Sequence, residues 1–337
     1  MSARETVVIS GGGGFIGAQV SKTFACAGYD VVVIDRGTRK WATKKYTVFS
    51  HDFFSSSTAD VLEKFKPNTF IHLAASHVIH DSVIDPGKYY KNNVSGTQTI
   101  LDMCVKAGVK NFIFSSSSSV YGETESKESF KEDMVPMPIT PYAKSKHMTE
   151  LMLEDYNKAY GLNYVSIRNF NAAGADPEGQ NGYTQEPAKH VVPIIIDKIL
   201  NNEEFIIFGN DYQTPDGTAL RDYCHIQDIA DAKLKAVNYL NNGGKSGIFN
   251  IGSGIGFSIM DIIKSAEKVI GKELKYKVGE RREGDSSFLC GDISKAKELL
   301  GWSPRYNLDE MLEHSVLWAN NKSKTISDLP FPTCGSA

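Results

Sequence analysis

Three side chains in the middle of the chain have the chemistry needed to oxidise an alcohol. Ser117 lies in a serine run, Ser115 to Ser119, and Tyr142 and Lys146 follow later in the chain. Positions four residues apart share one face of a helix, so the phenol and the ammonium can meet at one substrate. The cation is expected to lower the phenol pKa from its ordinary value of about 10 and so make it a base. Ser117, arriving from a strand end, is expected to hydrogen-bond the same substrate oxygen.

The spacing of Tyr142 and Lys146 does not define an enzyme by itself. A tyrosine and a lysine placed this way on an amphipathic helix usually serve packing and solvation. The elements that position them must therefore decide between the two interpretations.

A glycine-rich turn near the amino terminus is the first such element. An expected buried strand, Thr6 to Ser10, runs into it, and a helix follows as far as Ala27. Gly11, Gly14 and Gly17 fit the pattern GxxGxxG. Glycines let the backbone approach a pyrophosphate closely, and the helix amino terminus offers free amides to it. The turn is therefore predicted to bind a dinucleotide.

The next expected strand, Val31 to Ile34, ends at Asp35. An acid about 20 residues beyond the turn binds the 2′-hydroxyl of the adenosine ribose, which favours NAD over NADP. The neighbouring Arg36, Arg39 and Lys40 could still attract a 2′-phosphate, and otherwise they form a solvated loop.

Composition excludes several other classes of protein. The chain has 337 residues, 41% of them hydrophobic, and a net charge of −3. No basic block suggests a nucleic-acid partner. The longest apolar runs, such as Val191 to Ile196, fall short of the ~20 residues of a membrane span. Because Arg4 and Glu5 lead directly into a strand, no signal peptide is expected, and a cytoplasmic location is predicted.

The spacing of the cysteines and histidines does not indicate a metal site. The five cysteines are odd in number and scattered, so reduced thiols are expected rather than a disulfide framework or a zinc site. His72, His77 and His80 cluster without a clear fourth ligand. No metal is predicted.

Strand-like runs alternate with helical patterns through the first half of the chain. This alternation predicts an α/β fold with a Rossmann-type, doubly wound parallel sheet. Residues 1–171 are expected to form the NAD-binding domain, and a turn-rich stretch after Asn171 marks its end. Residues 172–322 are expected to form a smaller mixed α/β lobe that binds a nucleotide sugar, some segments of which return to the first domain. Residues 323–337 are expected to be a polar tail. The predicted helices are Tyr89 to Ala107, Tyr142 to Tyr160, Asp228 to Leu240, Ser258 to Ile270 and Leu308 to Ala319.

Nearly the whole chain resembles the extended short-chain dehydrogenase/reductases, and within them the UDP-galactose (UDP-glucose) 4-epimerases. The resemblance rests on segments of both halves. They are Gly13 to Gly17, His72 to Ala75, Tyr89 to Gly96, Asn111 to Ser116, Val120 to Gly122, Pro141 to Lys146, Ile207 to Tyr212, Asp216 to Thr218, Arg221 to Tyr223 and Arg281 to Asp285.

The resemblance implies reversible oxidation at carbon 4 of a UDP-hexose by tightly bound NAD+. Tyr142 would take the hydroxyl proton, and the resulting 4-keto sugar would turn its other face to the cofactor before reduction. The site would hold the nucleotide firmly and the sugar loosely. The resemblance also implies a homodimer formed through the helices at Tyr89 to Ala107 and Tyr142 to Tyr160.

The family's roles carry over to named positions of this chain. The implied cofactor-binding residues are Gly11, Gly14, Phe15, Ile16, Gly17, Asp35, Arg36, Asp52, Phe53, Leu73, Ala74, Ala75, Ser76, Asn92, Tyr142, Lys146 and Phe170. The implied substrate-binding residues are Ser117, Asn171, Val191, Phe208, Arg221, Arg282 and Asp285.

The chain departs from the family at His77, where Lys is common, and at Asn169, where Tyr is common.

Several alternative functions stay open. Nucleotide-sugar 4,6-dehydratases and decarboxylases place an acid just after the serine position, where this chain has Ser118 and Ser119. A UDP-glucuronate 4-epimerase shares the Tyr/Lys pair, and N-acetylated sugars depend on the space around Leu289, where the family varies. A non-catalytic NAD-binding sensor or scaffold is the alternative from another class.

Overall fold

The computed structural model describes residues 4–37, 46–123, 128–281 and 287–321. Its largest feature is a seven-stranded sheet in the order β10-β6-β5-β4-β1-β2-β3, with every neighbouring pair parallel. This confirms the predicted Rossmann-type sheet. The strands are β1 (Thr6–Ser10), β2 (Asp30–Ile34), β3 (Thr47–Phe49), β4 (Thr69–His72), β5 (Asn111–Ser117), β6 (Asn163–Asn169) and β10 (Gly247–Ile251).

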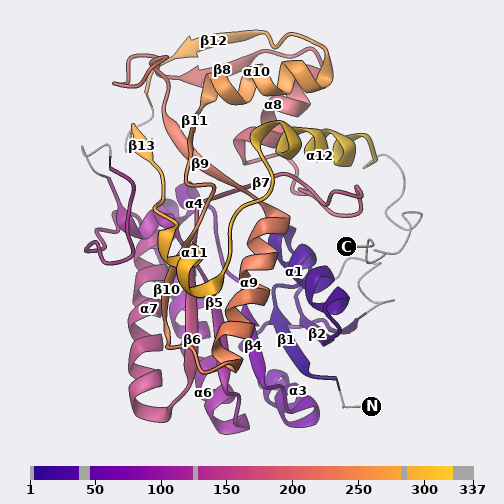
Figure 1. Ribbon diagram of the computed structural model, residues 1–337, viewed down its shortest axis with the longest axis vertical. Helices are drawn as coiled ribbons and strands as arrows, with labels where there is room; N and C mark the ends of the chain where they lie inside the picture. The colour runs from indigo at the N-terminus through magenta and orange to yellow at the C-terminus, as the bar shows by residue number, and fades with distance from the viewer. Residues whose placement is uncertain (1–3, 38–45, 124–127, 282–286, 322–337) are drawn as a thin grey trace.

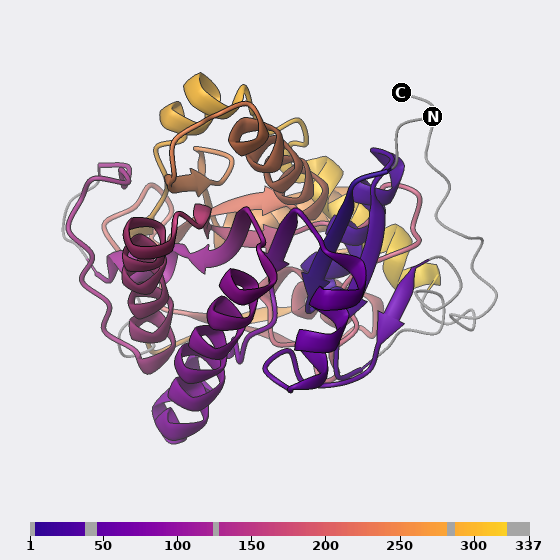
Figure 2. The same cartoon turned by 90° about the horizontal axis from the view of Figure 1, so that it is seen from below.

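Helices cover both faces of this sheet, as Figures 1 and 2 show. The first face carries α1 (Phe15–Cys26), α9 (Ile226–Asn241) and α11 (Ser294–Leu300). The opposite face carries α3 (Ser57–Phe65), α6 (Gly96–Ala107) and α7 (Pro141–Tyr160). Strand residues alternate between the two cores, because successive side chains of a strand point to opposite faces. Val7 and Ile9 face the first core, and Val8 faces the second.

The helix that carries Tyr142 and Lys146 has clear end signals. The Thr140 side chain accepts a hydrogen bond from the Ala143 amide, Pro141 occupies the first turn, and Gly161 ends the helix in the left-handed region at φ +70°. These are the residue types that begin and end helices. The predicted helix at Tyr89 to Ala107 consists of α5 (Pro86–Tyr89), a π-helical segment Tyr90–Ser95 and α6. α4 (Ile79–Ile84) packs beside α7.

A smaller body lies beyond one end of the sheet, in the upper part of Figure 1. Its core joins α8 (Val191–Leu200), α10 (Ile259–Ile270) and α12 (Leu308–Asn321) to two small sheets. The strands of those sheets are β7 (Asn171–Ala173), β8 (Phe205–Phe208), β9 (Leu220–His225), β11 (Gly256–Ser258), β12 (Tyr276–Gly279) and β13 (Phe288–Leu289). The chain crosses between the two bodies more than once, since β10 and α9 pack with the first body.

The structure also describes the state of four cysteines and the character of the helices. Cys26 is disulfide-bonded, contrary to the expectation of reduced thiols. The other cysteines of the described ranges, Cys104, Cys224 and Cys290, are free. Among the helices of those ranges, none combines the length and apolar character needed to cross a bilayer.

Candidate active site

A cleft of about 510 Å³ lies over the carboxyl ends of the parallel strands. Ligands of open α/β sheets bind at this edge, and the volume suits a small-molecule site. Five strands of the sheet contribute a residue at or just beyond their last position. These residues are Gly11, Asp35, Leu73, Ser117 and Asn169.

The structure brings the three predicted catalytic side chains together in this cleft. Ser117, Tyr142 and Lys146 all line it. The Ser117 side chain lies close enough to Tyr142 to act on the pKa of its phenol. The Lys146 ammonium lies 5.8 Å from the centre of the Tyr142 ring and donates a hydrogen bond to the Ser115 carbonyl oxygen at 2.7 Å. The cation therefore sits beside the phenol without bonding to it.

Burial controls the protonation of both groups. Burial raises the pKa of Tyr142 to about 12, while the polar Ser117 side chain acts in the opposite direction. It lowers the pKa of Lys146 to about 7, while the Glu150 carboxylate acts to raise it. The predicted lowering of the Tyr142 pKa is therefore wrong for this structure. Desolvation disfavours the phenolate, and it also disfavours the charge on the lysine that was expected to stabilise that phenolate.

The glycine turn has the close contacts that a dinucleotide-binding turn needs. Gly11 has a φ of +75°, and a Cβ there would lie 2.6 Å from the Ala74 amide nitrogen. A Cβ on Gly17 would lie 1.9 Å from the Gly11 carbonyl oxygen. Gly14 is the N-cap of α1 and no side chain caps that helix. Since helix amino termini attract anions, the turn can accept a phosphate at this end of α1.

Asp35 is fixed against the glycine turn. Its carboxylate accepts hydrogen bonds from the Gly13 amide at 2.9 Å and from the Gly37 amide at 3.0 Å. Arg36, which also lines the cleft, forms an ion pair with Asp52 at 3.4 Å. This pairing reduces the charge that Arg36 can offer to a 2′-phosphate, in agreement with a preference for NAD.

The remaining predicted cofactor residues lie in or beside the cleft. Those that line it are Phe15, Ile16, Phe53, Leu73, Ala74, Ala75, Asn92 and Phe170. Asp52 and Ser76 adjoin lining residues. The Asn93 side chain holds Ser76 in place, since it accepts from the Ser76 amide and donates to the Ser76 carbonyl, both at 2.9 Å. No signal in the sequence indicated this role of Asn93, although the neighbouring Asn92 is among the predicted cofactor residues.

The predicted substrate residues divide into three groups. Ser117 and Asn171 line the cleft, and the Asn171 amide donates to the Asp222 carbonyl at 2.9 Å. The second group lies outside the cleft wall and consists of Val191, Phe208 and Arg221. The third group, Arg282 and Asp285, lies outside the described residues. The binding roles of these positions stay predictions.

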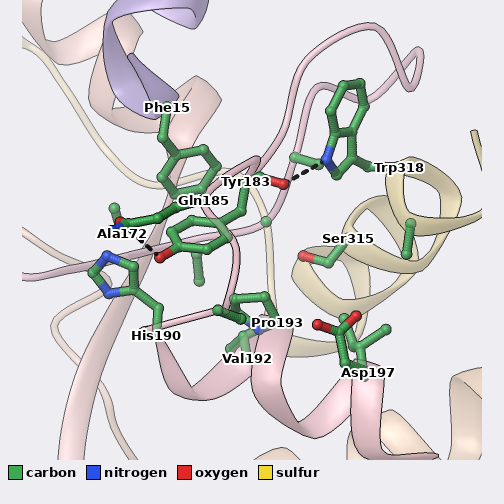
Figure 3. A pocket seen from close by; sticks show the side chains of 16 residues that line it. Phe15, Ala172, Tyr183, Gln185, His190, Val192, Pro193, Asp197, Ser315 and Trp318 are labelled. Atoms are coloured by element: carbon green, nitrogen blue, oxygen red, sulfur yellow. Dashed lines mark hydrogen bonds between the residues drawn. The ribbon is translucent and has the colours of Figure 1, made fainter. Parts of the chain in front are cut away.

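A wall of the cleft that the sequence analysis missed comes from the loop before α8. Tyr183 packs edge-to-face on Phe15, with 5.7 Å between ring centres, and on His190, with 5.1 Å. Figure 3 shows these rings together, with the Trp318 indole donating to the Tyr183 carbonyl at 2.8 Å. Thr184 and Gln185 complete this wall. The loop looked only turn-rich in the sequence, so its contacts carried no local signal.

The histidine cluster separates in the structure. His72 is buried, and its two ring nitrogens lie 2.7 Å from the Ser10 hydroxyl and 3.0 Å from the Thr97 hydroxyl. His77 lines the cleft instead. Within the described part of the chain, no group of three or more acidic, histidine or cysteine side chains has metal-binding geometry.

Comparison with known families agrees with this geometry. Residues 7–252 match the model of the NAD dependent epimerase/dehydratase family. The chain belongs to this family. The match covers the glycine turn, the acidic strand end and all three predicted catalytic residues.

Relatives of this epimerase/dehydratase family member extend over almost its full length. UDP-glucose 4-epimerase of Lacticaseibacillus casei is 38% identical over 329 residues, 96% of this chain and 99% of the relative. The crystal structure of UDP-glucose 4-epimerase from Brucella ovis in complex with NAD is 38% identical with a TM-score of 0.89, covering 93% of this chain and 97% of that one. The UDP-Glc/GlcNAc 4-epimerase of Campylobacter jejuni is 32% identical with a TM-score of 0.82, covering 94% and 99%.

The residues of this family member fit NAD. At the glycine turn, neighbouring backbone atoms leave no space for side chains on Gly11 and Gly17. Asp35 bonds to that turn, and Tyr142 and Lys146 line the same cleft. Ser118 and Ser119 follow Ser117 in the cleft, and among the described lining residues Asp35 is the only carboxylate. The acid that a dehydratase needs beside the serine is therefore missing from this part of the site.

Proposed function

We propose that this chain inverts carbon 4 of a UDP-hexose, interconverting UDP-glucose and UDP-galactose. The observation that carries the proposal is the grouping of Ser117, Tyr142 and Lys146 in a cleft whose described lining has no carboxylate beside them. Epimerisation needs one proton acceptor and one hydride acceptor, whereas loss of water needs a further acid. The named relatives act on UDP-glucose or UDP-GlcNAc, in agreement with this choice.

Each catalytic side chain has one task in the proposed reaction. NAD+, held by the glycine turn and Asp35, would supply the hydride acceptor for the oxidation and the hydride for the reduction. Tyr142 takes the proton of the carbon 4 hydroxyl and returns it to the same oxygen once the keto sugar has presented its opposite face, while Ser117 hydrogen-bonds that oxygen. Lys146 holds the end of β5 through the Ser115 carbonyl and contributes its charge beside the phenol. The sugar must turn over between the two steps, so binding energy should reside in the nucleotide.

A direct assay tests this proposal. Purified protein is incubated with UDP-galactose, UDP-N-acetylgalactosamine or UDP-galacturonate, first without added cofactor and then with NAD+, and the products are resolved by NMR. Conversion of UDP-galactose to UDP-glucose is expected. Preferential conversion of the N-acetylated sugar would favour a UDP-N-acetylglucosamine 4-epimerase, the alternative that depends on the space around Leu289 in the cleft wall. Absence of any conversion with NAD+ present would favour a binding protein without catalysis.

The proposal includes a homodimer in the cytoplasm. The exposed apolar side chains Met148 and Leu151 on α7 lie on one predicted interface helix, and Val83 and Ile84 extend the surface onto α4. Exposed apolar surface of this kind is typical of an interface. Light scattering after size-exclusion chromatography tests it, with Leu151→Glu expected to give a monomer.

A further inference from the structure

Lys233 is a buried lysine that the proposed reaction does not use. It lies on α9, behind the catalytic cleft, and its exposed fraction is 0%. Lys235, two residues later on the same helix, is exposed. Burial of an ammonium is costly unless it is paired, so a lysine in this position calls for an explanation.

The contacts of Lys233 lead to the catalytic strand. Its ammonium donates to the Asn169 side-chain oxygen at 3.4 Å. The Asn169 amide nitrogen in turn donates to the Ser115 hydroxyl at 2.8 Å and to the Ser116 carbonyl at 3.1 Å. Asn169 is also the register partner of Ser117 across β5 and β6. A chain of two hydrogen bonds therefore joins Lys233 to the end of β5.

Lys146 holds the same strand end from the other side of the sheet. Its ammonium donates to the Ser115 carbonyl oxygen at 2.7 Å. Two buried lysines, one on α7 and one on α9, thus share the short segment that carries the catalytic serine.

The charges around Lys233 leave it without a carboxylate partner within the described residues. On β9 its neighbour is the Cys224 thiol, and Asp222 accepts hydrogen bonds from Ser253, Gly254 and Gly291 instead. Arg168 of β6 is paired with Glu150. The other titratable groups on the elements around Lys233 also have partners of their own. Asp228 of α9 accepts hydrogen bonds from the Arg305 and Tyr306 amides. His225 contacts His314, and Lys22 of α1 forms an ion pair with Asp176. On α11 the ammonium of Lys295 lies over the Phe249 ring.

We propose that Lys233 is a positioning residue for the epimerisation: it holds the Asn169 amide against the end of β5, and its protonation adds a second positive charge behind Tyr142 and Lys146. The inference rests on the proposed function. Burial lowers the pKa of Lys233 to about 7, and the charge of Lys146 acts in the same direction. The second charge is therefore present below neutral pH and absent above it.

Three variants separate the two roles. Lys233→Met removes both the charge and the donor to Asn169, Lys233→Gln removes the charge but keeps a donor, and Lys235→Met is the matched control. Without the charge, a base in the cleft should have a higher pKa. The acid limb of the kcat/KM profile should therefore move up by about 0.5 to 1 pH unit in both Lys233 variants. The plateau kcat should fall about tenfold in Lys233→Met and recover in Lys233→Gln. Lys235→Met should match the wild type.

A second measurement does not depend on turnover. The folded-state pKa of about 7 lies below the ordinary value of 10.5, so the unfolded chain binds more protons between these values. The wild type should therefore lose stability relative to Lys233→Gln as pH falls from about 10 to about 7, with no further change below. Urea unfolding at several pH values measures this difference.

The outcomes distinguish the inference from the proposed function. An active wild type with the same acid limb in both Lys233 variants would overturn the role of Lys233 and leave the function intact. If the difference in unfolding free energy between the wild type and Lys233→Gln did not change with pH, Lys233 would not titrate near neutral pH in the folded protein, whatever the activity. A wild type that epimerises none of the sugars would overturn the proposed function, and with it the role of Lys233 in turnover.

Discussion

The Lys146 ammonium lies 5.8 Å from the centre of the Tyr142 ring, but its hydrogen bond goes to the carbonyl oxygen of Ser115. The lysine thus has a structural contact and an electrostatic effect at the same time. It fixes the end of the strand that carries Ser117, and it places a positive charge close to the phenol. The two effects have different experimental signatures, because only the second one depends on pH.

Replacing Tyr142 with Phe should remove the proton acceptor and little else. Turnover is expected to fall by about 10² to 10⁴-fold, the usual contribution of acid–base catalysis. Binding of NAD should be nearly unchanged, because the ring and its edge-to-face contact with Tyr89 remain. Tyr160→Phe, at an exposed position on the same helix, is the matched control. Unchanged turnover in Tyr142→Phe would contradict the assignment of the base.

Replacing Lys146 with Ala should alter the pH dependence as well as the rate. Loss of a nearby cation raises the pKa of Tyr142, so the activity optimum should move to higher pH. The cation of the wild type is itself lost as pH rises through the lowered Lys146 pKa of about 7, so above that value only the constant difference due to the lost Ser115 contact should remain. Steady-state rates between pH 5.5 and 9.5 test this, with the exposed Lys144→Ala as control. An optimum that does not move would exclude the electrostatic role.

The local parts of the site could be predicted from the sequence because their physical causes are local. A strand, a glycine turn and a helix follow one another without a break, and a spacing of four residues places Tyr142 and Lys146 on one helical face. Even the end of β5 was predicted to carry the catalytic serine, although the strand extends farther than the apolar run suggested.

The parts that were missed depend on contacts between distant segments. Tyr183 and His190 belong to a loop whose composition shows only turns, and they reach the cleft because Phe15 and Trp318 pack against that loop. Lys233 and Lys235 are equally polar in the sequence, and only the packing of α9 on the sheet determines which of them is buried. The raised pKa of Tyr142 has the same origin, since burial is a property of the assembled fold.

A single methyl group in the glycine turn should abolish cofactor retention. In Gly17→Ala the new Cβ would lie 1.9 Å from the Gly11 carbonyl oxygen, so the turn must change shape to accommodate it. The affinity for NAD should fall at least about tenfold, since the amides at the start of α1 would no longer be aligned with a phosphate. Gly87→Ala, whose nearest contact would be an ordinary 3.8 Å to the Asp85 carboxylate, is the control. Calorimetric NAD binding by both variants measures the difference, and equal affinities would contradict the phosphate role of the turn.

The buried ion pair behind the catalytic strand should make stability depend on acid pH. Glu150 accepts hydrogen bonds from Arg168 at 3.0 and 2.8 Å and from the Ser116 hydroxyl at 2.7 Å. Burial acts to raise the pKa of Glu150, but the nearby His147 ring and hydrogen bonds from Arg168 and Ser116 lower it below its ordinary value. Its stabilisation is therefore complete above the unfolded pKa of about 4.3 and is lost as pH falls through the lower folded value.

Glu150→Gln should consequently destabilise the protein at neutral pH by about 3 to 5 kcal/mol, because it leaves the Arg168 guanidinium buried without a counter-charge. The same substitution should matter less at pH values below the lowered folded-state pKa of Glu150, where the wild-type carboxylate also becomes neutral. Glu154→Gln, which breaks an exposed pair with Lys158 one turn away, should cost no more than about 0.5 kcal/mol at any pH. Urea unfolding of the three proteins across this pH range tests the prediction. A Glu150→Gln deficit that stays constant down to pH 3 would show that the lost stability comes from packing or hydrogen-bond geometry and not from the charge of Glu150.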